Sequence, residues 1–207
     1  MIIDNRSLFN LRERVKERLS EKRYNHTLGV ERMAEYIGNI LLPDLITELK
    51  AAALLHDIAK EIPYDSQVEL LANSGIPLSD EDLDTKPAIH SFAAVPLIKR
   101  DFSEYATKNV LSSVLNHTLG APAMSLFDEI IFISDYAEEG RTYPTCVSVN
   151  NFIKENIRKD RNQADNLSAL HIATLKAIDA TVESLQRRGE VINGRTISTQ
   201  KYFREIL

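Results

Sequence analysis

The feature that most limits the fold of this chain is the spacing of its apolar residues, which recur every three or four positions along most of its length. This spacing places apolar side chains on one face of an α-helix, whereas the alternating runs typical of strands are scarce. The sequence therefore predicts an all-α fold, a single compact helical bundle. The expected helices span about 7–19, 24–41, 45–60, 64–73, 86–100, 103–116, 125–138 and 163–188, with Gly189 as the cap of the last one.

Length and composition place further limits on the chain. Its 207 residues predict one domain over 1–207, with a core of about 20–188 and a C-terminal extension of 189–207. A net charge of −5 without a basic stripe argues against nucleic acid as a partner. No apolar run approaches membrane-spanning length, so we expect no membrane association and, by default, a cytoplasmic location.

The single cysteine excludes two kinds of site. With Cys146 alone, the chain cannot form an internal disulfide or a cysteine-based metal site. We expect Cys146 to be a small residue in a loop or at a helix start and not a nucleophile.

Several polar residues fall on the apolar faces of the expected helices. The pair His56-Asp57 follows the most apolar stretch of the chain, Ala51 to Leu55. A single core histidine is usually hydrogen-bonded to the backbone, but leaving many such groups unpaired would cost a few kcal/mol each. A shared cation explains the whole set economically, and helical bundles hold metal ions in this way. The predicted metal ligands, from five helices, are His26, His56, Asp57, His90, His117 and Asp135.

The number of candidate ligands favours a centre with two ions. Six protein ligands are more than one catalytic ion needs, because that ion keeps positions open for water and substrate. Asp57 has two carboxylate oxygens and can bridge two ions, while His56 binds one of them. Imidazole and carboxylate ligands without thiolate suit iron, manganese, zinc or cobalt.

The order His26, His56-Asp57, Asp135 resembles that of the HD-domain phosphohydrolases. Longer stretches are similar to the YqeK subfamily, the symmetrical diadenosine tetraphosphate hydrolases of bacteria. They are 23–30 (RYNHTLGV), 55–60 (LHDIAK), 89–91 (IHS), 116–118 (NHT) and 130–138 (IIFISDYAE), and the resemblance extends from about Ser20 to Phe203.

This resemblance implies a binuclear centre with two divalent ions, iron being the first expectation and manganese or zinc the alternatives. One ion would bind His26, His56, Asp57 and Asp135, and the other His90, His117 and a shared Asp57 oxygen. The implied reaction is symmetrical hydrolysis of diadenosine tetraphosphate to two ADP by a metal-activated water.

Three basic residues are candidates for substrate contacts. Lys60, one turn after His56, is expected with Asp57 among the catalytic residues, although a solvated lysine at a helix end is an equal alternative. Arg141 and Arg23 carry guanidinium groups that match phosphate, and the family pattern favours this role over that of surface arginines. Glu138 either supports a metal ligand from outside or is an exposed residue at a helix end. His171 matches no position of the family and is expected to be an ordinary helix residue.

Two other functions stay open. One is a different HD nucleotide phosphohydrolase, such as a nucleoside monophosphatase. The other is a non-catalytic, nucleotide-binding regulatory domain. In each case the partner is a small-molecule nucleotide, and the first helix offers a surface through which a homodimer can form.

Overall fold

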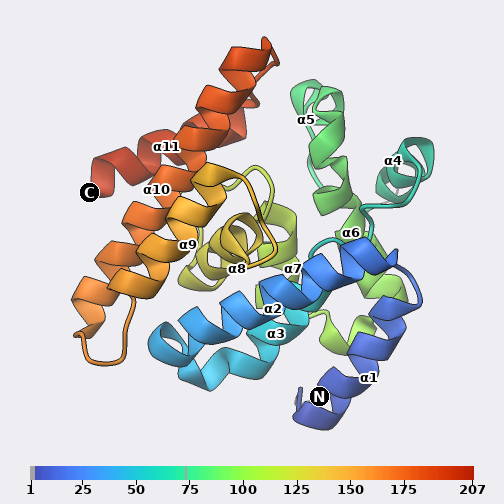
Figure 1. The fold of residues 1–207 in the computed structure, drawn as a ribbon. Coiled ribbons are helices and arrows are strands. Elements are labelled where there is room, and N and C mark those ends of the chain that lie inside the picture. The colour runs from blue at the N-terminus through green and yellow to red at the C-terminus, as the bar shows by residue number, and fades with distance from the viewer. Residues whose placement is uncertain (1–2, 73) are drawn as a thin grey trace.

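The computed structural model describes residues 3–72 and 74–207, and within these ranges it contains eleven α-helices, three short 3-10 helices and no strand (Figure 1). This confirms the all-α fold. Asn73, the expected end of one helix, and residues 1–2 of the predicted domain lie outside the described residues. The α-helices are α1 (Asn5–Lys16), α2 (Glu21–Leu41), α3 (Ile46–Leu55), α4 (Tyr64–Ala72), α5 (Asp80–Asp84), α6 (Ile89–Asp101), α7 (Lys108–Asn116), α8 (Leu126–Ala137), α9 (Pro144–Asn156), α10 (Gln163–Arg188) and α11 (Gly194–Ile206).

Helix α8 occupies the middle of the bundle (Figure 1). Every residue from Phe127 to Ser134 is buried, because α2, α3, α7, α9 and α10 all pack against this helix. Helices α9, α10 and α11 lie on one side of it, and α4, α5 and α6 on the other. Side chains from α2, α3, α7 and α8 can therefore meet in one interior region.

Local signals explain where several helices begin and end. Ser125 caps α8 by accepting a hydrogen bond from the backbone of Asp128, whose side chain accepts one from Ser125 in return. Gly189 ends α10 with φ +67°, the left-handed conformation that favours glycine, as expected. Helices α5, α9 and α11 were not predicted, although Ser79, Pro144 and Asn193 are typical helix-start residues.

The predicted helix 45–60 ends earlier than expected, at Leu55. Beyond this point the backbone makes tighter bonds between residues three apart, from Ile58 N to Leu55 O at 3.2 Å and from Lys60 N to Asp57 O at 2.9 Å. The apolar pattern continues through Ala59 and gives no stop signal before Pro63, so spacing alone could not reveal the change. His56 and Asp57 consequently lie at the end of α3 and not inside a regular helix.

Both ends of the chain contribute apolar residues to the interior. Leu8, Leu11 and Val15 of α1 belong to the main apolar cluster. Phe203 of α11 packs in a second cluster with residues of α8 and α10. The division into a core and a C-terminal extension stays a prediction. Among the described residues, no helix combines the length and the apolar character needed to cross a membrane.

Candidate metal centre

The structure brings all six predicted metal ligands together. His26 comes from α2, His56 and Asp57 from the end of α3, His90 from α6, His117 from the end of α7 and Asp135 from α8. Their ligand atoms form three overlapping triads in which all atoms lie within 4.8 Å of one another: His26, His56 and Asp57; His56, His117 and Asp135; and Asp57, His90 and His117. Asp57 is shared between two of these triads that otherwise have no residue in common.

The two carboxylate oxygens of Asp57 face different histidines. Oδ2 lies 3.7 Å from His26 Nε2 and 3.5 Å from His56 Nε2. Oδ1 lies 3.1 Å from His90 Nε2 and 3.6 Å from His117 Nε2. Asp57 thus stands between two histidine pairs, with one oxygen directed to each pair.

Asp135 belongs to the side of His26 and His56. Its Oδ1 lies 3.0 Å from His26 Nε2 and 3.9 Å from His56 Nε2. The side of His26 and His56 therefore has two imidazoles and two carboxylates. The side of His90 and His117 has two imidazoles and one carboxylate, that of Asp57, which both sides share.

Backbone carbonyls fix the orientation of three imidazole rings. The Nδ1 atoms of His56, His90 and His117 lie 2.6, 2.9 and 2.7 Å from the carbonyl oxygens of Ala53, Pro87 and Val114, each three residues earlier. A carbonyl only accepts hydrogen bonds, so each Nδ1 carries the proton and each Nε2 offers a lone pair to the interior. This arrangement is usual for histidines that bind metals.

Two of the inward-facing nitrogens have no hydrogen-bond partner. The Nε2 atoms of His26 and His56 are both buried and both lack one. Leaving a buried polar atom without a partner costs about 1–3 kcal/mol. A cation bound between these imidazoles and the nearby carboxylates would supply the missing interaction, so the residues present fit a divalent metal ion.

The three predicted substrate contacts surround the cluster. Arg23 Nη1 donates to Asp57 Oδ2 at 2.6 Å. Arg141 donates to the Asp135 backbone oxygen through Nε and Nη2, at 3.0 and 2.9 Å, and Nη2 also donates to Oδ1 at 2.5 Å. Lys60 Nζ lies 3.2 Å from His90 Nδ1. None of the three is isolated on the surface.

The charges in the cluster shift its pKa values in opposite directions. Burial lowers the pKa of His26, but the carboxylates of Asp135 and Glu138 close to its ring raise it more, to about 9. Burial lowers the pKa of His90 to about 4 despite the nearby Asp57. Burial raises the pKa of Asp57, but the surrounding histidines lower it well below its ordinary value. In the metal-free protein His26 is therefore protonated at neutral pH, whereas His90 is neutral.

Comparison with known proteins places the six candidate ligands within a stretch that matches one known family. The family model described as "HD domain" matches residues 23–140, which is more than half of the chain and includes all six candidate ligands. The chain belongs to the HD-domain family. A Bacillus subtilis (strain 168) protein named "Bis(5'-nucleosyl)-tetraphosphatase, symmetrical" is 30% identical over 151 residues, covering 72% of this chain and 77% of the relative. A Halalkalibacterium halodurans protein of the same name is 27% identical over 187 residues, 89% of this chain and 90% of the relative.

A solved structure supports the same assignment. It is the crystal structure of a "predicted HD superfamily hydrolase involved in NAD metabolism" from Clostridium acetobutylicum. Its TM-score is 0.80 at 29% sequence identity, and the match covers 96% of this chain and 97% of the other. With these relatives, this HD-domain protein is a hydrolase, and its histidine and aspartate cluster is compatible with a metal-binding site.

Two residues beside the HD-domain cluster have roles that the sequence left open or did not show. Glu138 is buried, and its Oε1 lies 3.2 Å from His26 Nδ1, so the alternative of an exposed helix end is wrong. Thr118 was not singled out, yet its hydroxyl lies 3.2 Å from His90 Nε2 and 3.1 Å from His117 Nε2. Its place in the family-like stretch 116–118, directly after His117, is the signal in the sequence that could have marked it.

His171 and Cys146 lie outside the cluster. His171 Nδ1 lies 3.0 Å from both carboxylate oxygens of Glu129, between α10 and α8. Cys146 lies in the first turn of α9, one of the two places expected for it, and burial raises the pKa of its thiol. Neither residue enters a candidate metal triad.

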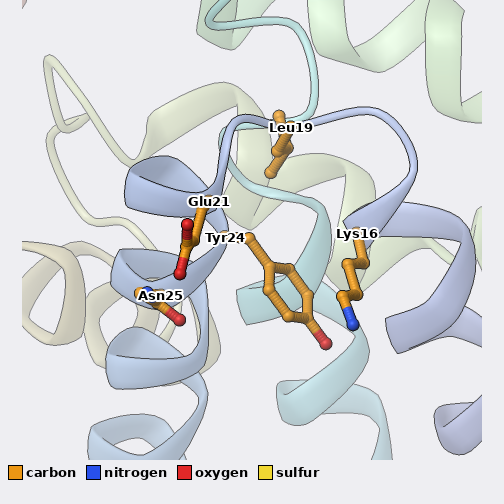
Figure 2. A pocket seen from close by; sticks show the side chains of 5 residues that line it. All are labelled: Lys16, Leu19, Glu21, Tyr24 and Asn25. Atoms are coloured by element: carbon orange, nitrogen blue, oxygen red, sulfur yellow. The ribbon is translucent and has the colours of Figure 1, made fainter.

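One pocket lies where α1 and α2 join, and Figure 2 shows its lining side chains coming from both helices and the turn between them. Its volume is about 420 Å³, and the lining residues are Lys16, Leu19, Glu21, Tyr24 and Asn25. No predicted ligand or substrate contact is among them, so the pocket is separate from the metal-binding cluster.

We expect metal uptake by the metal-free protein to release a proton. His26 must be neutral to bind a metal, and its pKa of about 9 keeps it protonated at neutral pH. Apparent affinity for Mn²⁺ should rise about tenfold per pH unit between about pH 6.5 and 8.5. Calorimetric titration in buffers of different ionisation enthalpy measures the protons released, and an affinity that does not change with pH would contradict this assignment.

The same pKa shift affects the metal-free fold. The pKa of His26 is raised above its ordinary value of 6.5, so protonated His26 stabilises the fold below about pH 6.5. This stabilisation is lost as the pH rises through about 9.

Proposed function

We propose that this HD-domain hydrolase holds two divalent metal ions and cleaves diadenosine tetraphosphate symmetrically into two ADP. The observation that carries the two-ion proposal is the position of Asp57, whose oxygens face two separate histidine pairs. The proposed substrate rests on the names of the relatives from Bacillus subtilis and Halalkalibacterium halodurans.

The first ion would be held by His26, His56, Asp57 Oδ2 and Asp135, and the second by His90, His117 and Asp57 Oδ1. When bound, such ions lower the pKa of water and neutralise phosphate charge. The donor set of nitrogen and oxygen suits iron, which we propose as the native metal, with manganese and zinc as alternatives.

The remaining residues would bind and orient the polyphosphate. Arg23 and Arg141 present guanidinium groups at two carboxylates on the side of His26 and His56, where their donors would also reach phosphate oxygens. Lys60 lies on the side of His90 and would contact a phosphate oxygen there. Hydrolysis adds one water across the central anhydride bond, so each product keeps two phosphates. A substrate held by Arg23 and Arg141 on one side of Asp57 and by Lys60 on the other would have its central bond near the metal-binding cluster.

A product assay with purified protein tests the proposed reaction. We expect ADP as the only nucleotide product from diadenosine tetraphosphate, measured by anion-exchange chromatography after addition of Fe²⁺ or Mn²⁺. ATP together with AMP would mean asymmetrical cleavage and would refute the proposal. Rapid release of phosphate from nucleoside monophosphates, without ADP from the dinucleotide, would identify the monophosphatase instead.

The presence of the complete ligand set argues against a non-catalytic regulatory domain, because each of the six proposed ligands is present and faces the cluster. A nucleotide as the small-molecule partner follows from the proposed reaction. The homodimer, the absence of nucleic-acid binding and the cytoplasmic location stay predictions.

A further inference from the structure

Glu138 is a buried acid that the proposed mechanism does not use. It follows the last turn of α8, three residues after Asp135, and only 4% of its surface is exposed. Its Oε1 accepts a hydrogen bond from His26 Nδ1 at 3.2 Å, and its Oε2 accepts one from the backbone N–H of Gly140 at 2.5 Å. His26 is the one ligand histidine whose Nδ1 faces a carboxylate in place of a carbonyl.

Gly29 makes the space that this carboxylate occupies. A Cβ atom at Gly29 would lie 2.2 Å from Glu138 Oε2 and 2.9 Å from its Cδ, so a side chain at this position would force the carboxylate to move. Gly29 lies inside α2, three residues after His26 and on the same side of the helix. Glycine inside a helix costs about 1 kcal/mol of helix stability relative to alanine. At this position its lack of a side chain lets the Glu138 carboxylate approach the backbone of α2.

Gly140 closes the other side of this space. A Cβ atom there would lie 3.0 and 3.1 Å from the two carboxylate oxygens of Glu138. The carboxylate is therefore enclosed between two glycines, with one backbone donor and one imidazole donor. An acid in this setting has little freedom to turn away from His26.

We infer that Glu138 is a positioning residue that holds His26 with Nε2 directed at Asp57 and Asp135, and that Gly29 is required for its placement. A carboxylate that accepts the outer N–H of a metal-binding histidine fixes the ring and makes its other nitrogen a better ligand. This inference rests on the proposed metal site, since it assigns Glu138 a role through His26.

The test compares Mn²⁺ affinity of metal-free variants by calorimetric titration. Glu138→Ala removes both hydrogen bonds and should weaken binding of the ion at His26 by about 10–100-fold. Glu138→Gln should lose less Mn²⁺ affinity than Glu138→Ala, because its amide oxygen can still accept a hydrogen bond from His26. Some loss should remain, because its amide NH₂ and the Gly140 N–H are both donors and cannot bond to each other. Gly29→Ala should weaken binding like Glu138→Ala, because its Cβ would push the Glu138 carboxylate away from His26. The unfolding temperature should change little or fall, because crowding of the interior offsets the preference of alanine for the helix.

Combining the two changes separates positioning from a general structural effect. If Gly29 acts only through Glu138, adding Gly29→Ala to Glu138→Ala should cause no further loss of Mn²⁺ affinity. Two matched controls lie nearby. Glu139→Gln removes an exposed carboxylate paired with Lys154, and Gly38→Ala crowds Leu49 in the core, where its Cβ would lie 2.6 Å from Cδ1. Both controls should bind Mn²⁺ as the unchanged protein does.

The outcomes distinguish this inference from the proposed function. An unchanged protein that fails to bind two ions would refute the two-ion centre itself. If it binds two ions and Glu138→Ala binds them equally well, the inference is overturned. If the losses of Mn²⁺ affinity from Gly29→Ala and Glu138→Ala add up in the double variant, Gly29 does not act through Glu138, and its proposed role is wrong. The visible spectrum of Co²⁺ bound at the site provides a second readout, because it changes when an imidazole ligand is displaced.

Discussion

Asp57→Asn is expected to abolish hydrolysis of diadenosine tetraphosphate and to prevent stable binding of both metal ions. The substitution keeps the shape of the side chain but replaces one ligand oxygen with an NH₂ group, which cannot bind a cation. Since the two oxygens face different histidine pairs, either orientation of the amide removes a ligand from one ion. The loss of negative charge weakens the other. We expect the turnover rate to fall by at least roughly 10³-fold.

Metal content by plasma mass spectrometry and ADP formation measure the two effects of this change together. Asp101→Asn is a matched control, because Asp101 also pairs with arginines but lies at the end of α6, outside the cluster. Near-normal activity in the Asp57 variant would show that the bridge is not part of the mechanism. Full activity of the Asp57 variant with half of the normal metal content would show that one ion is enough for the reaction.

Lys60→Met is expected to slow turnover by about 10²–10³-fold while metal content stays unchanged. Lys60 Nζ lies 3.3 Å from the Pro87 carbonyl that also accepts from His90, so the ammonium group borders one side of the cluster without being a ligand. Methionine keeps most of the apolar stem and removes the charge. The effect should appear in the turnover rate, because charge that develops on phosphate is greatest in the transition state.

Steady-state kinetics, with metal content measured on the same samples, test the role of Lys60. Lys50→Met serves as the control, since Lys50 is on the preceding helix α3 and pairs with Glu35 and Glu31, away from the ligands. Unchanged turnover in the Lys60 variant would favour the alternative, in which Lys60 is a solvated lysine at a helix end with no role in the reaction. Loss of bound metal would instead assign Lys60 to holding His90.

Much of the fold could be predicted from local patterns. The helices α2, α8 and α10 were expected within a few residues of their actual bounds, because their apolar periodicity and caps act within a few residues. Helices α9 and α11 were not predicted. Their starts carry typical residues, Pro144 and Asn193, but their buried apolar residues are few, and both helices pack mainly against α10. The tightened turn after Leu55 was invisible because apolar residues continue through it.

The candidate site shows the same limit. Helical spacing placed His26, His90, His117 and Asp135 on inward faces, and the adjacent His56 and Asp57 were singled out because they follow the most apolar stretch of the chain. Nothing in the spacing connected Glu138 to His26, because they are far apart in the chain and meet only where α8 packs on α2. The contact of Thr118 with two histidines depends likewise on how α6 and α7 pack together.

The sequence by itself determined that this is a helical protein and that imidazoles and carboxylates face its interior, because both follow from the geometry of single helices. The resemblance carried by the same residues also indicated the HD-domain family. Only the tertiary structure decided that Asp57 directs one oxygen to each histidine pair, and that Gly29 admits Glu138 behind His26. These are distances between atoms on different helices, and they depend on how close the helices approach and at which turn they cross.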